Sequence, residues 1–171
     1  MEMKLYSHAD AASIREMVLD LHDAVYGEEG DTFHSRERFG EFYDHWSSKD
    51  EWSCAVSFTD GTPVGFAYGS PFGPGGWWKG SERPAAVGPD DTVFGFSELL
   101  VMQEARKTGL SGRLHDAVVT SRGNDVATLL VDTAHPKVQA LYESWGYAKA
   151  DEQKPFDDSP IFAVLVKRLR G

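Results

Sequence analysis

The spacing of apolar residues predicts how the first half of the chain folds. After a short strand at residues 4–6, apolar side chains recur every three or four positions, which is the repeat of a helix with one buried face. This helix should begin after Asp10, whose side chain can cap it, and should end near Gly27. A second helix should begin at Ser35, because aromatic residues again fall on one side. These residues are Phe39, Phe42, Tyr43 and Trp46.

A β-hairpin is predicted after the two helices. Two stretches rich in β-forming residues, 52–58 and 63–70, are separated by the turn residues Asp60, Gly61 and Thr62. A short turn of this composition between two strands is typical of a hairpin. The two strands should therefore pair antiparallel.

A long loop follows the hairpin. Residues 71–91 hold five glycines and four prolines, with Trp77 and Trp78 in the middle. Connections of this length without secondary structure are uncommon unless they carry a function. We therefore interpret the segment as a functional loop.

The second half of the chain alternates strands with helices. A strand at 92–101 leads through a glycine cluster into a helix, and the apolar run at 127–132 is typical of a strand covered on both faces. These elements form a strand, helix and parallel strand unit. Another helix should begin at residue 135 or 136 and stop at Gly146, and one or two strands should close the chain, the last at 161–169.

Composition and charge narrow the class of protein. The chain has 171 residues, five tryptophans and 41% hydrophobic residues, which is typical of one globular domain spanning 1–171. Its net charge of −10 disfavours nucleic acid and anionic membranes as partners and favours a cationic substrate. A lone cysteine, Cys54, excludes an internal disulfide, and no Cys/His cluster indicates a metal site. Because neither a signal peptide nor a membrane span is evident, we expect a cytoplasmic protein.

The segment between the predicted fourth strand and the next helix carries the clearest chemical signal. Gly109, Ser111 and Gly112 are small residues beside a helix N-terminus, where successive backbone N–H groups can surround a phosphate. Their spacing matches neither a nucleotide phosphate loop nor a dinucleotide-binding turn. Taken alone, an ordinary loop that closes onto a helix is the stronger interpretation. Basic residues add positive charge here: Arg106, Lys107 and Arg113.

With its flanking strand, this segment resembles the GNAT superfamily of acetyl-CoA-dependent N-acetyltransferases. The family signature is Gln or Arg, two residues, Gly, one residue, then Gly or Ala, and here it stands as Arg106–Ser111 after the strand SELLV. The sequence departs from the common pattern at Gln103, Lys107 and Ser111. Serine is small and keeps its N–H, so the implied pyrophosphate contact should survive.

A second motif supports the same resemblance. The later helix of the family commonly carries LYE, two residues, Gly and Phe or Tyr, and residues 135–147 read HPKVQALYESWGY. His135 and Val138 stand where asparagine and alanine are usual. The two motifs cover residues 92–150, and the order of elements extends the resemblance to the whole chain.

The resemblance implies a fold and a cofactor. The fold is α+β in α/β/α layers, with a mixed, mostly antiparallel, twisted sheet of six to seven strands, about four helices and a splay between strands 4 and 5. The cofactor is acetyl-CoA, with its pyrophosphate on the glycine cluster and its pantetheine arm along the fourth strand. The implied cofactor-binding residues are Leu99, Leu100, Val101, Arg106, Lys107, Thr108, Gly109, Leu110, Ser111, Gly112, Arg113 and His135.

The resemblance also implies two catalytic side chains. Glu98 is the candidate base that accepts the proton of the amine, and Tyr142 is the candidate acid that protonates the departing thiolate. A different interpretation remains for each residue. Glu98 could face solvent or pair with an arginine, and Tyr142 could be a core tyrosine with its hydroxyl at the surface.

Two regions are implied to hold the acceptor. Aromatic rings and carboxylates suit a cation, so we expect a small-molecule amine, such as a cationic metabolite or antibiotic. Alternatively, the tryptophans cover a hydrophobic edge and the carboxylates form a solvated surface. The candidate substrate-binding residues are Tyr26, Glu28, Glu29, Trp77 and Trp78.

The leading hypothesis is an N-acetyltransferase, and the alternative is a non-catalytic acyl-CoA-binding or regulatory module. A homodimer is among the expected states, because the last strand is a common dimer contact in similar proteins. Cys54 is interpreted as a small core residue. The scattered histidines are interpreted as surface or helix residues: His8, His22, His34, His45 and His115.

Overall fold

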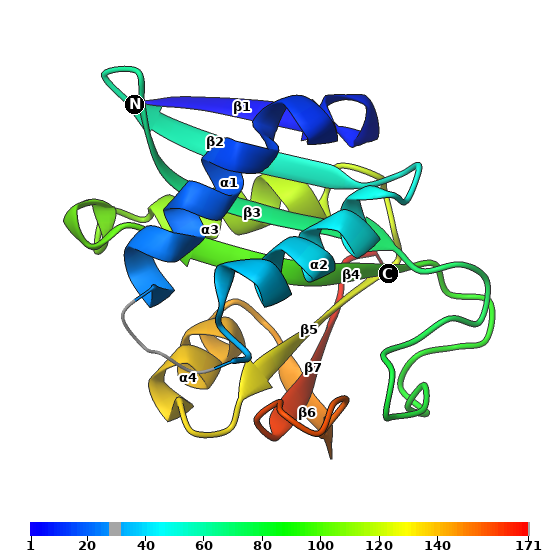
Figure 1. The fold of residues 1–171 in the computed structure, drawn as a ribbon. Coiled ribbons are helices and arrows are strands. Elements are labelled where there is room, and N and C mark those ends of the chain that lie inside the picture. Colours follow the sequence, from blue (N-terminus) through cyan, green and yellow to red (C-terminus); the bar gives the residue numbers. More distant parts are fainter. Residues whose placement is uncertain (28–31, 171) are drawn as a thin grey trace. The chain divides into compact units, whose positions relative to one another are not determined.

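The apolar repeats fold into strands and helices close to the predicted positions (Figure 1). The computed structural model describes residues 1–27 and 32–170. In chain order the elements are β1 (Glu2–Ser7), η1 (His8–Asp10), α1 (Ala11–Tyr26), α2 (Arg36–Ser47), β2 (Ser53–Thr59), β3 (Thr62–Pro71), β4 (Val93–Val101), η2 (Gln103–Ala105), α3 (Leu110–Val119), β5 (Val126–Asp132), α4 (Pro136–Ser144), β6 (Ala148–Gln153) and β7 (Phe162–Arg168). The labels η1 and η2 denote short 3-10 helices.

The strands follow the order β1-β2-β3-β4-β5-β7-β6 in a mixed sheet. The β4–β5 pair is parallel. The pairs β1–β2, β2–β3, β5–β7 and β6–β7 are antiparallel. The β4–β5 ladder pairs Val93–Phe96 with Val126–Leu129 and ends there, which leaves the second half of β4 outside it. This is the predicted α+β fold, with a mostly antiparallel sheet that opens between strands 4 and 5.

The final strand, β7, lies inside the sheet and not at its edge. β7 is paired with β5 along one edge and with β6 along the other. Both rows of its backbone hydrogen-bonding groups are therefore occupied within the chain. β7 therefore has no unpaired edge, and a homodimer with a contact at the last strand stays a prediction.

The chain divides into two compact units. Unit 1 comprises Met1–Ser70 and Ser97–Ser121, and unit 2 comprises Pro71–Phe96 and Arg122–Gly171. In the described residues, no helix is long and apolar enough to cross a membrane. The same residues contain no group of three or more histidine, cysteine or acidic side chains arranged to hold a metal ion.

Unit 1 is built around the inward faces of β2 and β3. Their alternating side chains meet α1 and α2 on one face of the sheet, whereas α3 packs on β2 from the other face (Figure 1). The buried core on the α1 and α2 side is rich in aromatic rings, and the Tyr43 hydroxyl donates to Ala11 O over 2.6 Å. The core includes Ile14, Val18, Phe39, Tyr43, Trp52, Phe66 and Tyr68.

Local turn chemistry determines where several elements begin and end. Asp60 and Gly61 both have positive φ, 51° and 78°, as a two-residue hairpin turn requires. The Ser35 hydroxyl accepts from the backbone N–H of Arg38 and so caps α2. Asp10 is the N-cap residue of α1, as predicted, but its carboxylate makes no capping bond to α1 and accepts from the N–H of Ser7 at η1 instead.

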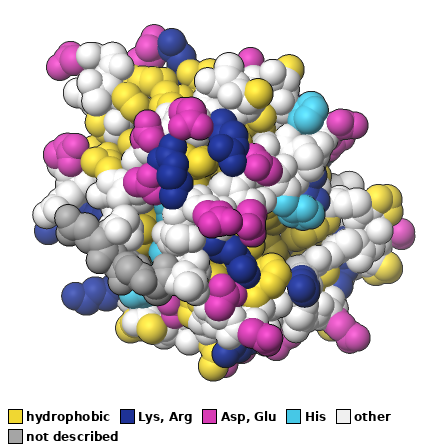
Figure 2. Space-filling view, viewed as in Figure 1, with side chains coloured by type: hydrophobic (Ala, Val, Ile, Leu, Met, Phe, Trp, Pro, Cys, Tyr) yellow, Lys and Arg dark blue, Asp and Glu magenta, His cyan; other side chains and the backbone are white. Residues whose placement is uncertain are grey.

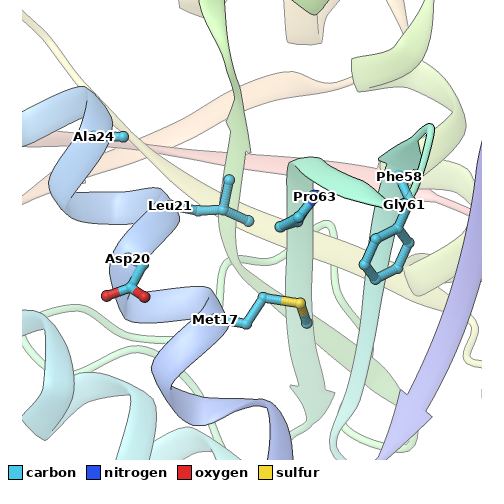
Figure 3. Close-up of a pocket in the computed structure, with 7 residues that line it drawn as sticks. All are labelled: Met17, Asp20, Leu21, Ala24, Phe58, Gly61 and Pro63. Atoms are coloured by element: carbon cyan, nitrogen blue, oxygen red, sulfur yellow. The ribbon is translucent and has the colours of Figure 1, made fainter.

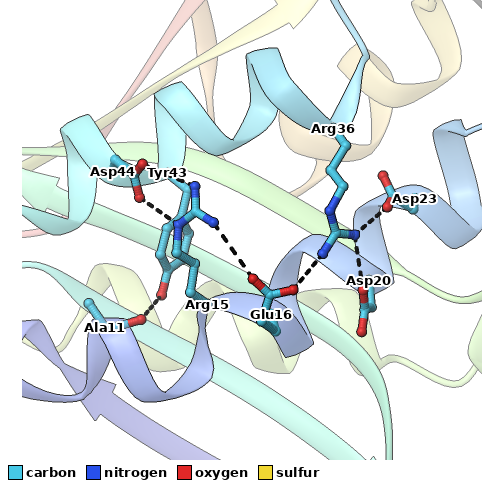
Figure 4. A network of polar contacts seen from close by, with 8 residues as sticks. All are labelled: Ala11, Arg15, Glu16, Asp20, Asp23, Arg36, Tyr43 and Asp44. Carbon is cyan, nitrogen blue, oxygen red and sulfur yellow. Dashed lines mark hydrogen bonds and ion pairs between the residues drawn. The ribbon is translucent and has the colours of Figure 1, made fainter.

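Two arginines join α1 to α2 (Figure 4). Arg15 on α1 donates to Asp44 on α2 over 2.8 Å, and Arg36 on α2 contacts three carboxylates of α1. These are Glu16, Asp20 and Asp23. Figure 2 shows acidic and basic side chains interleaved over these two helices. Single exposed ion pairs contribute little, but a network of them fixes how α2 lies on α1.

Unit 2 is held together by two arginines in addition to its β5–β7–β6 ladder. Arg83 donates to Gly76 O over 3.2 Å and to Gly88 O over 2.9 Å, which closes the long loop on itself. Arg168 on β7 donates to the Asp91 carboxylate over 2.8 Å. This bond, together with the N–H of Gly88, lowers the pKa of Asp91 to about 2. The long loop is therefore an ordered part of unit 2.

Candidate functional site

The turn between β4 and α3 holds two residues in the left-handed region. Lys107 has φ 62°, and Gly109, the N-cap of α3, has φ 79°. A Cβ added to Gly109 would meet no other atom within 4 Å, so lack of space does not explain the glycine. The positive φ does, because glycine adopts it without strain. The chain turns sharply onto the helix. Ser111 and Gly112, which were expected ahead of the helix, lie in its first turn.

The first turn of α3 presents backbone N–H groups for which the helix itself has no acceptors. The first backbone hydrogen bond recorded at this end is donated by the N–H of Arg113 to Gly109 O over 3.3 Å. The N–H groups of Leu110, Ser111 and Gly112 are therefore directed out of the helix at its positive end. The buried Leu110 side chain anchors this end in the core of unit 1. The arrangement fits the phosphate groups of an anionic cofactor.

Side chains of the same segment brace the turn or remain exposed beside it. Arg106 Nε donates to Val101 O over 3.1 Å, and the Thr108 hydroxyl donates to a carbonyl of η2 over 2.6 Å. These two bonds hold the turn to the end of β4. Lys107 and Arg113 are exposed and bring positive charge to the helix N-terminus. The structure thus brings together the predicted residues from Arg106 to Arg113.

The second half of β4 leads into this turn. Residues Leu99–Val101 lie beyond the ladder with β5, and the Leu100 side chain is buried in the core. On the β3 side, Leu100 O lies 3.0 Å from the position of a Cβ added to Gly65. Glycine at this point allows β3 and β4 to approach closely. The neighbouring β3 strand therefore holds the end of β4 in place.

Glu98 lies on β4 just before these residues. Its side chain is half-buried, and within the described residues no hydrogen bond or ion pair is found at its carboxylate. Burial alone raises the pKa of Glu98 to about 8. The carboxylate is thus not paired with an arginine. A carboxyl group with this proton affinity is suited to accept a proton near neutral pH.

Tyr68 on β3 is a neighbour that the sequence analysis missed. Its side chain is fully buried and packs against Tyr43 and Trp52, with ring centroids 5.8 Å away in each case. Burial, and then the negative charge of Glu98, raise the pKa of Tyr68 well above its ordinary value. The Tyr68 hydroxyl therefore remains protonated, and it is close enough to Glu98 to be influenced by its charge. The alternation of inward residues in β3, Phe66 and then Tyr68, was the available sequence signal.

Tyr26, a predicted acceptor residue, lies at the end of α1 in an aromatic stack. Its ring centroid is 4.8 Å from that of His34 and 4.8 Å from that of His22, which stacks on Phe39 at 4.0 Å. Burial lowers the pKa of His22 to about 4, so its ring is neutral at pH 7. His22 and His115 are 3% and 0% exposed, and both face the core from their helices rather than the surface.

Two predicted residues of unit 2 lie in and before α4. Tyr142 is 8% exposed, and its ring meets Trp145 and Tyr147 edge to face, with centroids 5.3 Å and 5.8 Å away. His135 is the N-cap of α4, and its exposed ring lies with Nε2 3.6 Å from the Asp132 carboxylate. The sequence LYESWGY therefore builds a small aromatic cluster around Tyr142.

The two tryptophans of the long loop have structural contacts of their own. Trp78 Nε1 donates to the Thr128 hydroxyl on β5 over 3.0 Å. Trp77 packs with Phe72 against buried valines of unit 2. Both indole rings are half-buried, so each combines packing with some exposed surface.

A pocket of about 370 Å³ lies on unit 1 between α1 and the β2–β3 hairpin (Figure 3). Apolar side chains from both elements face it, and its one carboxylate, Asp20, is engaged by Arg36. None of the predicted site residues lines it. The lining residues are Met17, Asp20, Leu21, Ala24, Phe58, Gly61 and Pro63. Glu28 and Glu29, the remaining predicted acceptor residues, lie outside the described residues.

Comparison with known proteins identifies the fold. No family model matches the sequence, and no curated protein matches it. Several solved structures are similar to this chain in fold. Aminoglycoside 6'-acetyltransferase type Ii is 16% identical with a TM-score of 0.67, covering 100% of this chain and 99% of that one. PaiA N-acetyltransferase from Thermoplasma acidophilum, solved with coenzyme A, is 13% identical with a TM-score of 0.60 and coverage of 98% and 99%.

A third similar structure comes from an enzyme with a different acceptor. Ribosomal-protein-alanine N-acetyltransferase from Brucella melitensis is 16% identical with a TM-score of 0.60, covering 99% of this chain and 100% of that one. The fold of this protein is therefore that of the GNAT N-acetyltransferases, as the two sequence motifs predicted.

Proposed function

We propose that this protein is an N-acetyltransferase that transfers the acetyl group of acetyl-CoA to a primary amine by direct attack in a ternary complex. The observation that carries the proposal is the open N-terminus of α3, which follows the left-handed residues Lys107 and Gly109. The GNAT-like fold supports it. We further propose that residues 1–171 act as one acetyltransferase domain and that the protein is cytoplasmic, for which its lone cysteine is the supporting feature.

The residues around α3 and the end of β4 would hold acetyl-CoA. The N–H groups of Leu110–Gly112 would bind the pyrophosphate, and Lys107 and Arg113 would add charge. The backbone of Leu99–Val101 would pair with the pantetheine arm in the manner of an added strand, and one of these N–H groups would polarise the carbonyl under attack. His135 is a further residue that we propose for cofactor binding. Acetyl-CoA supplies the thioester carbonyl that the amine attacks.

Glu98 would accept the proton that the amine loses. Its half-buried carboxylate has no cationic partner, and this supports the role. The charged form of Glu98 would gain such a partner only when the ammonium group of a substrate binds. The buried Tyr68 hydroxyl would stay neutral and orient the carboxylate. Glu98 would be the final acceptor of the proton both when the amine transfers it directly and when a water molecule relays it.

Tyr142 would give a proton to the departing thiolate, since a phenol is protonated at neutral pH. Tyr142→Phe should lower turnover on the order of a hundredfold while leaving the affinity for acetyl-CoA unchanged. Steady-state rates and calorimetric titration would measure the two quantities. Tyr147→Phe, in the same aromatic cluster, is the matched control and should keep its activity. Normal turnover in Tyr142→Phe would remove this residue from the mechanism.

The acceptor is proposed to be a small cationic amine, such as a metabolite or antibiotic. Tyr26, Trp77 and Trp78 would offer aromatic faces, and Glu28 and Glu29 would offer carboxylates. The acidic composition of the chain supports a cationic substrate. The competing proposal is a non-catalytic acyl-CoA-binding module. It is favoured by the departures from the common family pattern at Lys107, Ser111 and His135.

A panel of acceptors would test the proposed function. Release of free CoA from acetyl-CoA should be followed with aminoglycosides, polyamines, amino acids and peptides carrying free amino groups. We expect release that depends on at least one cationic amine. Tight binding of acetyl-CoA without release on any amine would support the non-catalytic module instead. Failure to bind acetyl-CoA at all would overturn both proposals.

A further inference from the structure

The β1 strand is an open edge of the sheet. It pairs with β2 along Glu2–Ser7 and stands at the end of the strand order (Figure 1). Alternate backbone N–H and C=O groups of β1 point away from β2, and within the described residues no strand pairs with them. An edge of this kind can accept another strand.

The two faces of β1 differ in the side chains that they present. Met3 and Leu5 are 36% and 56% exposed and share one face of the strand, whereas Glu2 and Lys4 share the other. The opposite edge of the sheet is β6, and it is guarded by charged side chains and an irregular register at Lys149. A strand added at this edge would cover these two exposed apolar residues.

The sequence of β1 places opposite charges across from each other in one antiparallel register with itself. The residues whose backbone N–H and C=O groups point away from β2 alternate along β1. In a two-fold symmetric pairing, each of these residues lies opposite another residue of the same set, so the two residue numbers of a pair add up to an even number. When Met3 lies opposite the partner's Met3, Glu2 lies opposite the partner's Lys4 and Lys4 opposite the partner's Glu2. A shift that centres the pairing on Lys4 would instead place two ammonium groups opposite each other, which is unfavourable.

We propose that β1 is a homodimer interface, in which a second copy of this chain adds its own β1 antiparallel and centred on Met3. The apolar pair at Met3 and the two Glu2–Lys4 pairs then lie on opposite faces of the joined strands. Pairing of two six-residue strands buries little area, and interfaces below about 1,200 Å² are typical of weak association. The dimer should form at high protein concentration, and it does not depend on the acetyltransferase activity.

Cysteine cross-linking would test the register. Cα atoms directly opposite each other in an antiparallel pair are about 4.5–5.5 Å apart, which suits a disulfide. Met3→Cys should therefore form a cross-linked dimer under mild oxidation, and Lys4→Cys should form far less. Cys54 is buried and should not react. Efficient cross-linking of Lys4→Cys but not Met3→Cys, or of neither variant, would overturn the proposal.

Charge reversal would test the interface without a covalent bond. Sedimentation equilibrium should give a dissociation constant at least on the order of tenfold higher for Lys4→Glu and for Glu2→Lys, since each change places like charges opposite each other twice. The double variant should recover the dimer. Lys149→Glu on β6 is the control and should dimerise as the wild type does. A wild-type chain that stays monomeric at all concentrations, or a double variant no better than the single ones, contradicts the proposal.

Discussion

Replacing Glu98 by glutamine should lower kcat/KM for acetyl transfer by about 10²- to 10⁴-fold, which is the usual contribution of a positioned general base. Glutamine keeps the shape of the side chain but cannot accept a proton. Steady-state rates on the best amine of the acceptor panel would measure the loss. Glu41→Gln on the exposed face of α2 is the matched control. A Glu98→Gln enzyme with wild-type kcat/KM would exclude Glu98 as the base.

The pH dependence of the same pair of enzymes follows from the pKa of about 8 at Glu98. Because a base works in its deprotonated form, the ratio of wild-type to Glu98→Gln rates should rise with pH and level off above about 8. Ionisation of the amine enters both profiles and cancels in the ratio. A ratio that does not change between pH 6 and pH 9 would mean that no proton is lost to Glu98.

The contribution of Glu98 to thermal stability should fall as the pH rises, whereas its contribution to the rate should rise. The folded pKa of Glu98 lies above its ordinary value of 4.5, so the stabilising effect of the neutral form is complete below pH 4.5 and is lost as the pH rises through about 8. Glutamine is neutral throughout. The gain in Tm of Glu98→Gln over wild type should therefore be larger at pH 9 than at pH 5. This comparison separates burial of the carboxylate from its role in catalysis.

Replacing Ser111 by aspartate should weaken acetyl-CoA binding on the order of a hundredfold while stabilising the fold slightly. Ser111 lies in the first turn of α3, where a carboxylate interacts favourably with the helix dipole, by about 0.3–1 kcal/mol. The same charge repels a bound pyrophosphate, and two like charges about 4 Å apart interact by about 4 kcal/mol near a protein surface. Calorimetric titration would give the affinity and thermal melting the stability.

The opposite signs of these two effects distinguish a cofactor site from a connecting loop. In an ordinary loop closing onto a helix, the aspartate would raise Tm and change nothing else. Ser111→Asn supplies a side chain of the same shape without the charge and should bind acetyl-CoA much better than the aspartate variant. Equal affinity of the aspartate variant and the wild type would remove the α3 N-terminus from the proposed site.

Local sequence was sufficient for most of the fold. The alternation of apolar residues located the strands, the three- and four-residue repeats located the helices, and Asp60–Gly61 gave the hairpin its turn. Gly146, with φ 101°, ends α4 as its position after LYESW predicted. These features depend on residues a few positions apart, and the chain itself brings such residues together.

Motifs also pointed to the turn that we propose as the cofactor site, but they did not predict its conformation. The small residues Gly109, Ser111 and Gly112, taken together with the second motif at residues 135–147, predicted a phosphate-binding segment beside a helix. The left-handed angles of Lys107 and Gly109, and the start of α3 at Leu110, came only from the structure. A positive φ at a lysine is uncommon, and no sequence rule anticipates it.

The sequence by itself determined the kinds of elements and their order, because these follow from local periodicity and turn chemistry, and the resemblance carried by its two motifs predicted the class of fold. Only the tertiary structure decided that Glu98 is half-buried without a cationic partner and near Tyr68, that His22 and His115 face the core, and that β7 is an inner strand while β1 is an open edge. Burial and strand order depend on contacts between distant segments, and these contacts set the proton affinity of a carboxylate and the partners of an edge.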